Sequence, residues 1–399
     1  MERELAERDG RTRRDYLGYG AAVVGGSLLA GCADESGGNA TPTAIDGTSP
    51  ADESTGTEGG SYSVSMEPVG ELTFESVPET WLPYGGGYAD MSVALGRAEG
   101  LVGVGGASRY YTYVYDELPG VSVDRERLEA NDPGAADMSK EVFYELDGDV
   151  HVMDPEMLVN WFEWSRDDVE EIAGNVGPFL GNLIFRREDE WHDYRYYTLY
   201  EAFEKVAELF QEQERYRAFE SLHDEFLADV QTRLPPADER PNVLLVYEGS
   251  DEPEAFSPYR LNDRGTSKKQ WRDLGVSDAL SGTGIHGIST TDRGRIDYET
   301  MLEIDPDVIM LRAHERKSAA EFRDTVLEFM RNHPVGGELT AVQNGRVYRG
   351  GYLYQGPIHN LFLTERGAKQ LYPEVFGEVT GDAELFDRQR VADIVTGDA

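Results

Sequence analysis

One long amphipathic stretch dominates the middle of the chain. Between Tyr197 and Arg233, apolar side chains recur every three or four residues, a spacing that places them on one face of an α-helix. The prolines of Leu234-Pro235-Pro236 end the pattern, since proline cannot continue a helix. The spacing predicts a linking helix within residues 194–236, with one interruption allowed. The repeating positions are Leu199, Phe203, Val206, Phe210, Phe219, Leu222, Phe226 and Val230.

Strand and helix patterns alternate on both sides of this stretch. Segments with the composition of short buried strands lie at 72–77, 100–105, 149–153, 242–247, 307–311 and 345–349. Residues 89–98, between the first two, have a helical pattern. Alternation of this kind favours parallel sheets covered by helices. The sequence therefore predicts an α/β fold of two lobes, 70–193 and 237–399, each with a mainly parallel sheet flanked by helices.

A weak internal repeat supports the division into two lobes. Asp154-Pro155-Glu156-Met157-Leu158 in the first half is echoed by Asp297-Tyr298-Glu299-Thr300-Met301-Leu302 in the second. Each segment places a glutamate at the start of a predicted helix. Such acids are favoured there by the helix dipole, whatever else they do.

The N-terminal segment has the pattern of an export signal. Arg13 and Arg14 precede the apolar run 17–31, which is too short to span a bilayer comfortably. The arginine pair resembles a twin-arginine signal, and Leu29-Ala30-Gly31-Cys32 resembles the lipobox of a lipoprotein. We expect a signal peptide at 1–31, a lipid on Cys32 and a disordered acidic tether over 32–69, in which Asn39 begins a weak glycosylation motif.

Cys32 is the only cysteine, so no intrachain disulfide can form and the fold must rest on its core. The resulting expectation is a protein anchored by lipid to the outer face of the cytoplasmic membrane.

Acidic residues outnumber basic ones by 76 to 37, which gives a net charge of −39. The excess is dispersed along the chain and only six residues are lysine. A basic partner could explain this balance, but the dispersion favours adaptation to high salt, where charges are screened over about 3 Å at 1 M. Nucleic acid is excluded as a partner because binding a phosphate backbone requires a basic stripe.

Several short motifs, in this order, resemble one family of proteins. They are the helix, Pro-Asp and strand element "ETMLEIDPDVI" (299–309), "LTAVQNGRVYRG" (339–350) and "AKQLYPEVFG" (368–377). Together with the long helix they resemble the ABC-transporter substrate-binding proteins that carry ferric siderophores, cobalamin and haem. "DDVEEIAGNVGPF" (167–179) and "TERGAKQLYPE" (364–374) are similar to the iron-siderophore branch of salt-loving archaea.

The resemblance implies a two-lobed clamp with limited hinge motion and a ligand in the cleft between lobes. It also implies an ABC permease and its ATPase as partners, with one glutamate on each lobe docking onto the permease. By position in the repeat these are Glu156 and Glu299. The ligand would be a ferric siderophore, with haem or cobalamin as alternatives; a surface sensor or adhesion protein that reuses the clamp is the rival class.

Ligands of open α/β sheets gather beyond the carboxyl ends of the strands. Aromatic faces and arginine forks there would suit a bulky, anionic ferric chelate, although tyrosines at loop ends are often rim or core residues. The predicted ligand-binding residues are Tyr84, Tyr88, Arg109, Tyr110, Trp164, Tyr247, Arg260, Arg312, Tyr352 and Tyr354. Less specific candidates in the same loops are Trp81, Tyr111, Trp161, Tyr259, His314 and Gln355.

Other site chemistries fit the sequence poorly. The seven histidines are scattered, and His314-Glu315 lacks the second histidine of a metalloprotease helix because Ser318 occupies that position. Gly103 to Gly106 lack the full dinucleotide fingerprint, and no phosphate loop or nucleophile elbow is present. We therefore predict no metal site, no enzyme activity and no cofactor, with iron entering only as part of the ligand.

Overall fold

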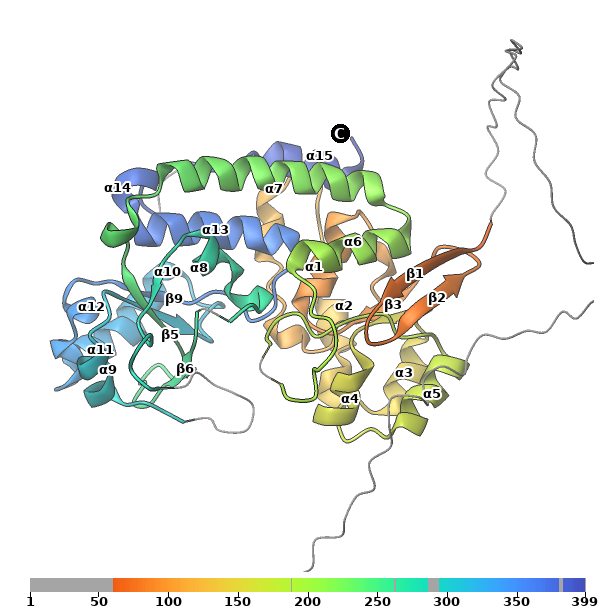
Figure 1. Cartoon of the computed structure of the whole chain (residues 1–399), viewed down its shortest axis with the longest axis horizontal. Helices are drawn as coiled ribbons and strands as arrows, with labels where there is room; N and C mark the ends of the chain where they lie inside the picture. The colour runs from red at the N-terminus through yellow and green to blue at the C-terminus, as the bar shows by residue number, and fades with distance from the viewer. Residues whose placement is uncertain (1–59, 188, 262, 286–293, 380–382, 399) are drawn as a thin grey trace, which may run out of the picture. The chain divides into compact units, whose positions relative to one another are not determined.

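The computed structural model describes residues 60–398 except 188, 262, 286–293 and 380–382. Arg13, Arg14, Cys32 and Asn39, with the predictions made for them, lie outside the described residues. The described residues belong to one compact unit, 58–399. Within it, strand and helix segments form two α/β lobes (Figure 1).

The N-terminal lobe contains a short parallel sheet and a separate hairpin. Its strands are β1 (Tyr62–Met66), β2 (Gly70–Phe74), β3 (Trp81–Pro83) and β4 (Val150–Val152). Its helices are α1 (Gly86–Ala94), α2 (Arg125–Ala130), α3 (Lys140–Leu146), α4 (Pro155–Trp161) and α5 (Arg166–Asn175). β3 pairs in parallel with β4, and single parallel bridges extend the sheet at Leu101, Gly105 and Phe179.

Two predictions for this lobe are wrong. The segment 72–77 does not pair with 100–105: β2 pairs with β1 in an antiparallel hairpin, and the parallel neighbour of 101–105 is β3. β1 also lies inside the segment 32–69 that was assigned to the tether. The alternating residues Val64 and Met66 are each 1% exposed, which explains why this short polar-looking stretch belongs to the fold.

The linking segment consists of two helices, where the sequence predicts one long helix with one interruption. α6 (Leu199–Phe210) and α7 (Gln213–Arg233) are separated by Gln211, whose φ of 56° breaks the helix. Thr198 and Glu201 form a capping box that fixes the start of α6. α7 runs along one edge of the molecule from the N-terminal to the C-terminal lobe (Figure 1).

The C-terminal lobe is built on a five-stranded sheet. Its strands are β5 (Asn242–Tyr247), β6 (Ser257–Tyr259), β7 (Ser277–Asp278), β8 (Val308–Arg312) and β9 (Val347–Arg349). The order is β6-β5-β8-β9, with β7 also paired to β5, and only the β5–β6 pairing is antiparallel. The predicted segments 242–247, 307–311 and 345–349 correspond to β5, β8 and β9.

Helices cover both faces of this sheet. They are α8 (Lys269–Asp273), α9 (Tyr298–Ile304), α10 (Ala319–Phe322), α11 (Glu328–Asn332), α12 (Thr340–Gln343) and α13 (Pro357–Leu371). Two further helices, α14 (Pro373–Phe376) and α15 (Arg388–Thr396), follow α13. A π turn, Arg323–Leu327, joins α10 to α11. Leu244 and Ile309 face a core with α9 to α12, whereas Leu245 and Met310 face a second core with α8 and α13.

That second core continues into the N-terminal lobe. It includes the apolar faces of α1, α6, α7, α13 and α15, so one hydrophobic cluster runs through both lobes. α13 is buried along nearly its whole length and packs on α1, α6, α7 and α8. α15, which the sequence placed in the C-terminal lobe, packs on α1 and α7. A shared core of this extent opposes large hinge motion, because opening the lobes would expose apolar surface.

Candidate functional site

A pocket opens between the lobes at the carboxyl ends of the parallel strands. The N-terminal lobe lines it with segments that follow β3, β4 and the bridge at Phe179, and the C-terminal lobe adds a turn before α8 and the loop after β9. This is the position expected for a ligand site in α/β sheets. The lining residues are Tyr84, Gly87, Tyr88, Met153, Asp154, Met157, Asn182, Leu183, Ile184, Phe185, Thr266, Tyr354 and Gln355.

The lobes approach closely at this pocket because of a glycine run. Gly85 has a φ of 80°, a conformation that glycine adopts without strain, and donates its backbone N–H to the Gly105 carbonyl at 2.8 Å. A Cβ atom on Gly85 would lie 2.8 Å from the Tyr354 ring, and one on Gly87 would lie 3.0 Å from the Gln355 carbonyl oxygen. The sequence Tyr84-Gly85-Gly86-Gly87-Tyr88 therefore lets the loop after β9 pack directly against the start of α1.

Aromatic rings form one wall of the pocket. The ring of Tyr354 lies 4.7 Å from that of Phe185 and 5.9 Å from that of Tyr84, both edge-on. Outside the pocket lining, the Trp161 ring lies 6.0 Å from that of Phe185, and the Arg186 guanidinium lies 4.4 Å above the Trp161 ring. These faces can pack against a flat or aromatic ligand group.

Six predicted residues meet in a tyrosine–arginine cluster contributed by both lobes: Tyr84, Arg109, Tyr247, Tyr259, Arg312 and Tyr354. The exposed Arg109 interacts electrostatically with Tyr354, Tyr247 and Tyr84. The Arg312 guanidinium lies 5.0 Å from the ring of Tyr259, which also interacts electrostatically with Tyr247. The phenols supply hydrogen-bond donors and the guanidiniums supply positive charge, so the cluster is suited to an anionic ligand.

Arg312 is more buried than a simple ligand contact would be. It is 2% exposed and donates hydrogen bonds to the carbonyls of Ser267 and Gly350. Burial lowers the pKa of its guanidinium, and Tyr259, Glu315 and Asp263 partly oppose this shift. Arg312 therefore supports the wall beneath Tyr259.

The polar floor of the pocket comes from the N-terminal lobe. Tyr88 donates to the Asn182 carbonyl at 2.9 Å and accepts from the Asn182 backbone N–H at 3.0 Å. Asp154 accepts from the Leu183 N–H at 2.8 Å and from the Tyr194 hydroxyl at 2.6 Å. Burial raises the pKa of the Asp154 carboxyl to about 7, although these hydrogen bonds oppose the shift.

Four of the predicted ligand residues point elsewhere in this structure. Trp164 lies in the core, where its indole N–H donates to the Met138 carbonyl at 2.8 Å. Tyr110 is 2% exposed and its hydroxyl pairs with that of Tyr115. Tyr352 is 1% exposed and stacks on Tyr111, while Arg260 donates to the Leu280 and Ile285 carbonyls. None of the four lines the pocket, because their polar groups have partners inside the fold.

Among the less specific candidates, only Gln355 lines the pocket. Its amide donates to the Thr266 carbonyl at 2.8 Å, which ties the loop after β9 to the turn before α8. Trp81 and His314 are each 2% exposed and therefore belong to the core.

Sequence reasoning missed Asp154, Asn182, Phe185 and Thr266 as pocket residues. Asp154 directly follows β4, so the rule of carboxyl ends could have selected it. The other three lie in irregular segments without a strand or motif, and nothing in the sequence marks them.

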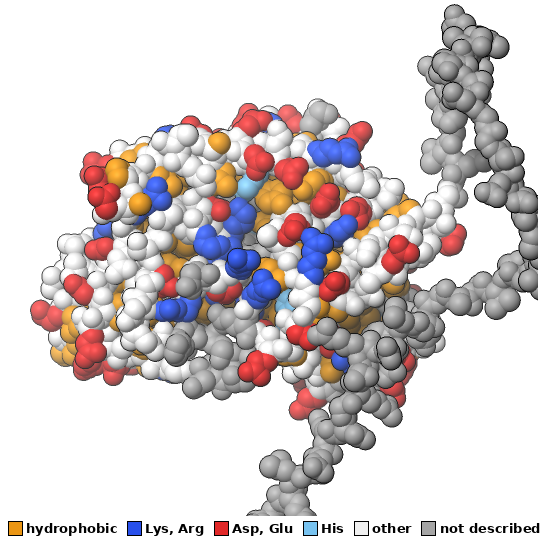
Figure 2. All heavy atoms as spheres, in the orientation of Figure 1, with side chains coloured by type: hydrophobic (Ala, Val, Ile, Leu, Met, Phe, Trp, Pro, Cys, Tyr) orange, Lys and Arg blue, Asp and Glu red, His pale blue; other side chains and the backbone are white. Residues whose placement is uncertain are grey.

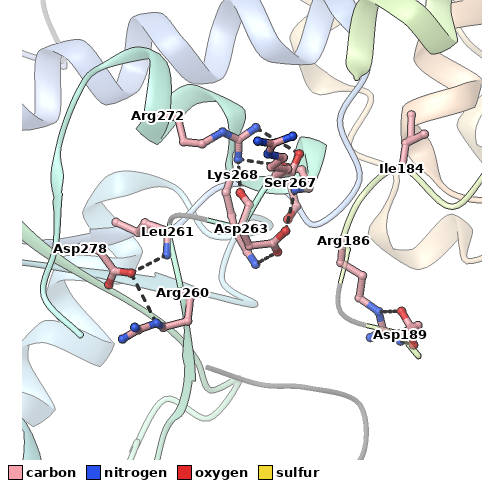
Figure 3. Close-up of polar contacts among 12 residues, drawn as sticks. Ile184, Arg186, Asp189, Arg260, Leu261, Asp263, Ser267, Lys268, Arg272 and Asp278 are labelled. Carbon is pink, nitrogen blue, oxygen red and sulfur yellow. Dashed lines mark hydrogen bonds and ion pairs between the residues drawn. The ribbon is translucent and has the colours of Figure 1, made fainter. Parts of the chain in front are cut away.

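Direct contacts between the lobes flank the pocket on both sides. On one side, the backbone N–H of Thr266 donates to the Ile184 carbonyl at 2.9 Å. Figure 3 shows Ile184 and Arg186 of the N-terminal lobe and, across the seam between the lobes, Ser267 and Lys268 of the C-terminal lobe. On the other, Arg316 donates to the Ser108 carbonyl and pairs with Glu129, both at 3.0 Å. The pocket is thus framed by contacts that lobe opening would break.

The candidate docking glutamates differ in their surroundings. Asp154 and Asp297 cap α4 and α9, which places Glu156 and Glu299 in the first turns of these helices, as the repeat predicted. Glu299 is exposed, whereas Glu156 pairs with Arg166 through two hydrogen bonds of 2.6 and 3.1 Å. α4 and α9 lie along the edge of the molecule opposite α7 (Figure 1).

Within the described ranges, no three His, Cys, Asp or Glu side chains lie close enough together to hold a metal ion. No helix in the same ranges is long and apolar enough to cross a membrane.

A fold of two α/β lobes around an interlobe pocket defines a class of solute-binding proteins, and the sequence agrees. Residues 84–352 match the family described as periplasmic binding protein, so this chain belongs to the periplasmic binding protein family. Members of the family are extracytoplasmic solute-binding proteins and not enzymes. Among curated proteins, none matches this chain in sequence.

Solved structures share the fold at low identity. The petrobactin-binding protein YclQ of Bacillus subtilis is 13% identical, with a TM-score of 0.54 over 78% of this chain and 99% of that one. The iron uptake ABC transporter substrate-binding protein PiuA of Streptococcus pneumoniae is 17% identical, with a TM-score of 0.52 over 77% and 97%. CeuE of Helicobacter pylori with Ni(II) bound is 16% identical, with a TM-score of 0.53 over 79% and 90%. These likenesses confirm the predicted fold class.

Proposed function

We propose that this protein is the binding component of an ABC importer and captures a ferric siderophore between its lobes. The observation that carries the proposal is the tyrosine–arginine cluster, which both lobes build and which shares Tyr84 and Tyr354 with the aromatic pocket. The chain needs no cofactor for this role, since iron would arrive within the chelate. YclQ is named as a petrobactin-binding protein and PiuA as an iron uptake substrate-binding protein, and both names support the same class of ligand.

Charge gives a physical reason for arginines at this place. A chain with a net charge of −39 repels anions at long range, and ferric chelates of catecholates and citrate are anionic. Positive side chains in a partly enclosed cleft offset this field where the ligand must sit. Bidentate guanidinium contacts to carboxylate or phenolate oxygens add orientation to the attraction.

A binding titration tests the proposal. Arg109→Ala should weaken a ferric chelate about tenfold or more, equivalent to about 1.4 kcal/mol, because it removes the exposed charge of the cluster. Arg127→Ala removes an exposed arginine of α2 outside the pocket and is the matched control. Quenching of tryptophan fluorescence by two anionic chelates, ferric citrate and a ferric tris-catecholate, would report affinity. Equal affinities for both variants and the wild type would refute the role of Arg109.

Docking onto a permease is proposed for Glu156 and Glu299. Because Arg166 already holds Glu156, docking there would exchange one arginine for another, whereas Glu299 is exposed. Alanine at both positions should abolish ligand uptake by vesicles that contain the transporter, while leaving chelate affinity unchanged. Loss of affinity would instead assign the two residues to the clamp itself.

The lipid anchor is also part of the proposal. Cys32 would carry the lipid, and Arg13 and Arg14 would direct folded export. Cys32→Ser should move the protein from the membrane fraction to the soluble fraction, and lysines in place of both arginines should block export. A membrane-bound Cys32→Ser variant would contradict the anchor.

A further inference from the structure

A second charged region lies on the seam between the lobes, outside the pocket. Here residues 184–196 of the N-terminal lobe meet residues 263–272 of the C-terminal lobe. The backbone of Ser267 donates to the Phe185 carbonyl at 3.2 Å, and the Tyr196 hydroxyl donates to the Arg264 carbonyl at 3.1 Å. Figure 2 shows lysine and arginine side chains gathered in the middle of one face, over α8 and the turn before it.

Three acids of this region form ion pairs with their neighbours, while Glu190 and Asp193 lie exposed in the same N-terminal segment. Asp189 pairs with Arg186 at 2.7 Å, Asp263 pairs with Lys268, and Asp273 pairs with Lys269 at 2.6 Å. Arg187, Arg264 and Arg272 form no ion pair with a carboxylate in the part of the chain that the structure describes. Three guanidiniums without a carboxylate are unexpected in a chain with twice as many acidic as basic residues.

These three residues are called the seam arginines; the guanidiniums of Arg187 and Arg272 and the backbone of Arg264 lie around Tyr196. The Arg187 guanidinium lies 5.2 Å from the centroid of the Tyr196 ring, and Tyr196 holds the Arg264 backbone through its hydroxyl. Arg272 donates to the Asp263 and Gly265 carbonyls at 2.6 and 3.0 Å, and to the Arg264 carbonyl at 3.4 Å. Arg272 is thereby fixed in place, whereas Arg187 and Arg264 are exposed.

Two of the seam arginines, Arg264 and Arg272, also repel each other. Burial lowers the pKa of Arg272, and the charge of Arg264 lowers it further, although Asp273, Tyr196 and Asp263 oppose these effects. A bound anion would relieve this repulsion and occupy donors that the fold leaves unused.

We propose that the seam arginines form a binding site for a phosphate group, either free phosphate or the headgroup of a lipid. Arginine forks match the oxygens of phosphate, and a doubly charged tetrahedral anion can contact more than two of them at once. A carboxylate fits less well, because it carries one charge and two oxygens. Ile184, Phe185 and Thr266 belong to the same seam and line the pocket, so an anion held by Arg187 and Arg264 would join the lobes behind the ligand site.

Calorimetric titration of the full-length protein with inorganic phosphate, in buffers of constant ionic strength set with KCl, tests the site. The wild type should bind one phosphate saturably. Arg187→Ala with Arg264→Ala should weaken this binding at least tenfold, and lysine at both positions should restore part of it. The matched control is Arg323→Ala with Arg390→Ala, which removes two exposed arginines paired with Asp324 and Glu225 and should leave binding unchanged.

Vesicles distinguish the source of the phosphate group. Sedimentation with phosphatidylglycerol vesicles, compared with phosphatidylcholine vesicles, should show binding that depends on Arg187 and Arg264 if the group belongs to a lipid. Binding of phosphate without vesicles assigns a free anion. If the wild type binds neither probe, or if the alanine pair and the control pair bind both probes equally, the proposal is wrong. Circular dichroism melting of each variant would show that lost binding is not lost folding.

Discussion

Replacing Asp154 by asparagine should change how the stability of the protein depends on pH. Asp154 is 2% exposed and burial raises the pKa of its carboxyl from 3.8 to about 7. In the unfolded chain the group ionises near pH 4, whereas in the folded protein it ionises near pH 7. Below about pH 4 both states are protonated and the carboxyl costs nothing. As the pH rises from about 4 to about 7, ionisation increasingly favours the unfolded state.

The magnitude follows from the size of the shift. About three pKa units at about 1.4 kcal/mol each give a cost of about 4 kcal/mol above pH 7. The Asp154→Asn variant has no carboxyl to ionise at this position, so its free energy of unfolding should gain about this much on the wild type between pH 4 and pH 7. The amide also removes one acceptor, toward the Leu183 N–H or the Tyr194 hydroxyl, but that penalty does not depend on pH.

Urea denaturation of both proteins at one salt concentration, followed by circular dichroism at pH 4 to 8, measures the difference directly. Comparing the two proteins removes the contribution of most other titrating groups. A difference in unfolding free energy that stays constant between pH 4 and pH 7, or that moves in favour of the wild type, would refute the assignment of a raised pKa to Asp154.

Three further predictions follow from packing and charge. Gly85→Ala should cost about 1–3 kcal/mol of stability and weaken chelate binding, because the new methyl group would clash with Tyr354 and the backbone φ of 80° would be strained. Gly106→Ala is the control that isolates the backbone strain, because its φ is 71° but its methyl group would lie in open space. Glu315→Ala should destabilise the fold by about 3–5 kcal/mol, because Arg366 would lose the carboxylate to which it donates two hydrogen bonds of 2.8 and 3.0 Å. Urea denaturation measures the change, and a loss below about 1 kcal/mol would contradict the prediction. The melting temperature should rise between low and molar KCl, because the net charge of −39 repels itself; a melting temperature independent of salt would argue against adaptation to high salt.

The sequence predicted the C-terminal sheet well because its central strands are buried on both faces. β5 and β8 are continuous apolar runs, which is the pattern of parallel strands covered by helices. β3 escaped prediction because it is only three residues long and contains Pro83. Its parallel neighbours at Leu101 and Gly105 are single bridges, so the N-terminal sheet has little repeating signal.

The sequence selected residues near the pocket where they directly follow a strand, and it missed pocket residues outside the named strands. Tyr84 follows β3 and Tyr247 ends β5, and both lie in the tyrosine–arginine cluster. Trp164 follows α4 rather than a strand and fills the core, where its indole N–H donates to the Met138 carbonyl. Phe185 and Thr266 meet only through tertiary contacts between distant segments. Which aromatic side chain turns toward the cleft depends on such contacts and cannot be read from spacing.

Native mass spectrometry of the protein purified from iron-starved cells tests the central claim most directly. The account predicts one ferric chelate per chain, lost on denaturation, with an iron isotope pattern in the mass difference. The aromatic or carboxylate groups of the identified chelate would indicate which parts of it contact Arg109 and Tyr354. A co-purified ligand without iron, or a protein that stays empty and binds none of the ferric chelates in titration, would contradict the claim.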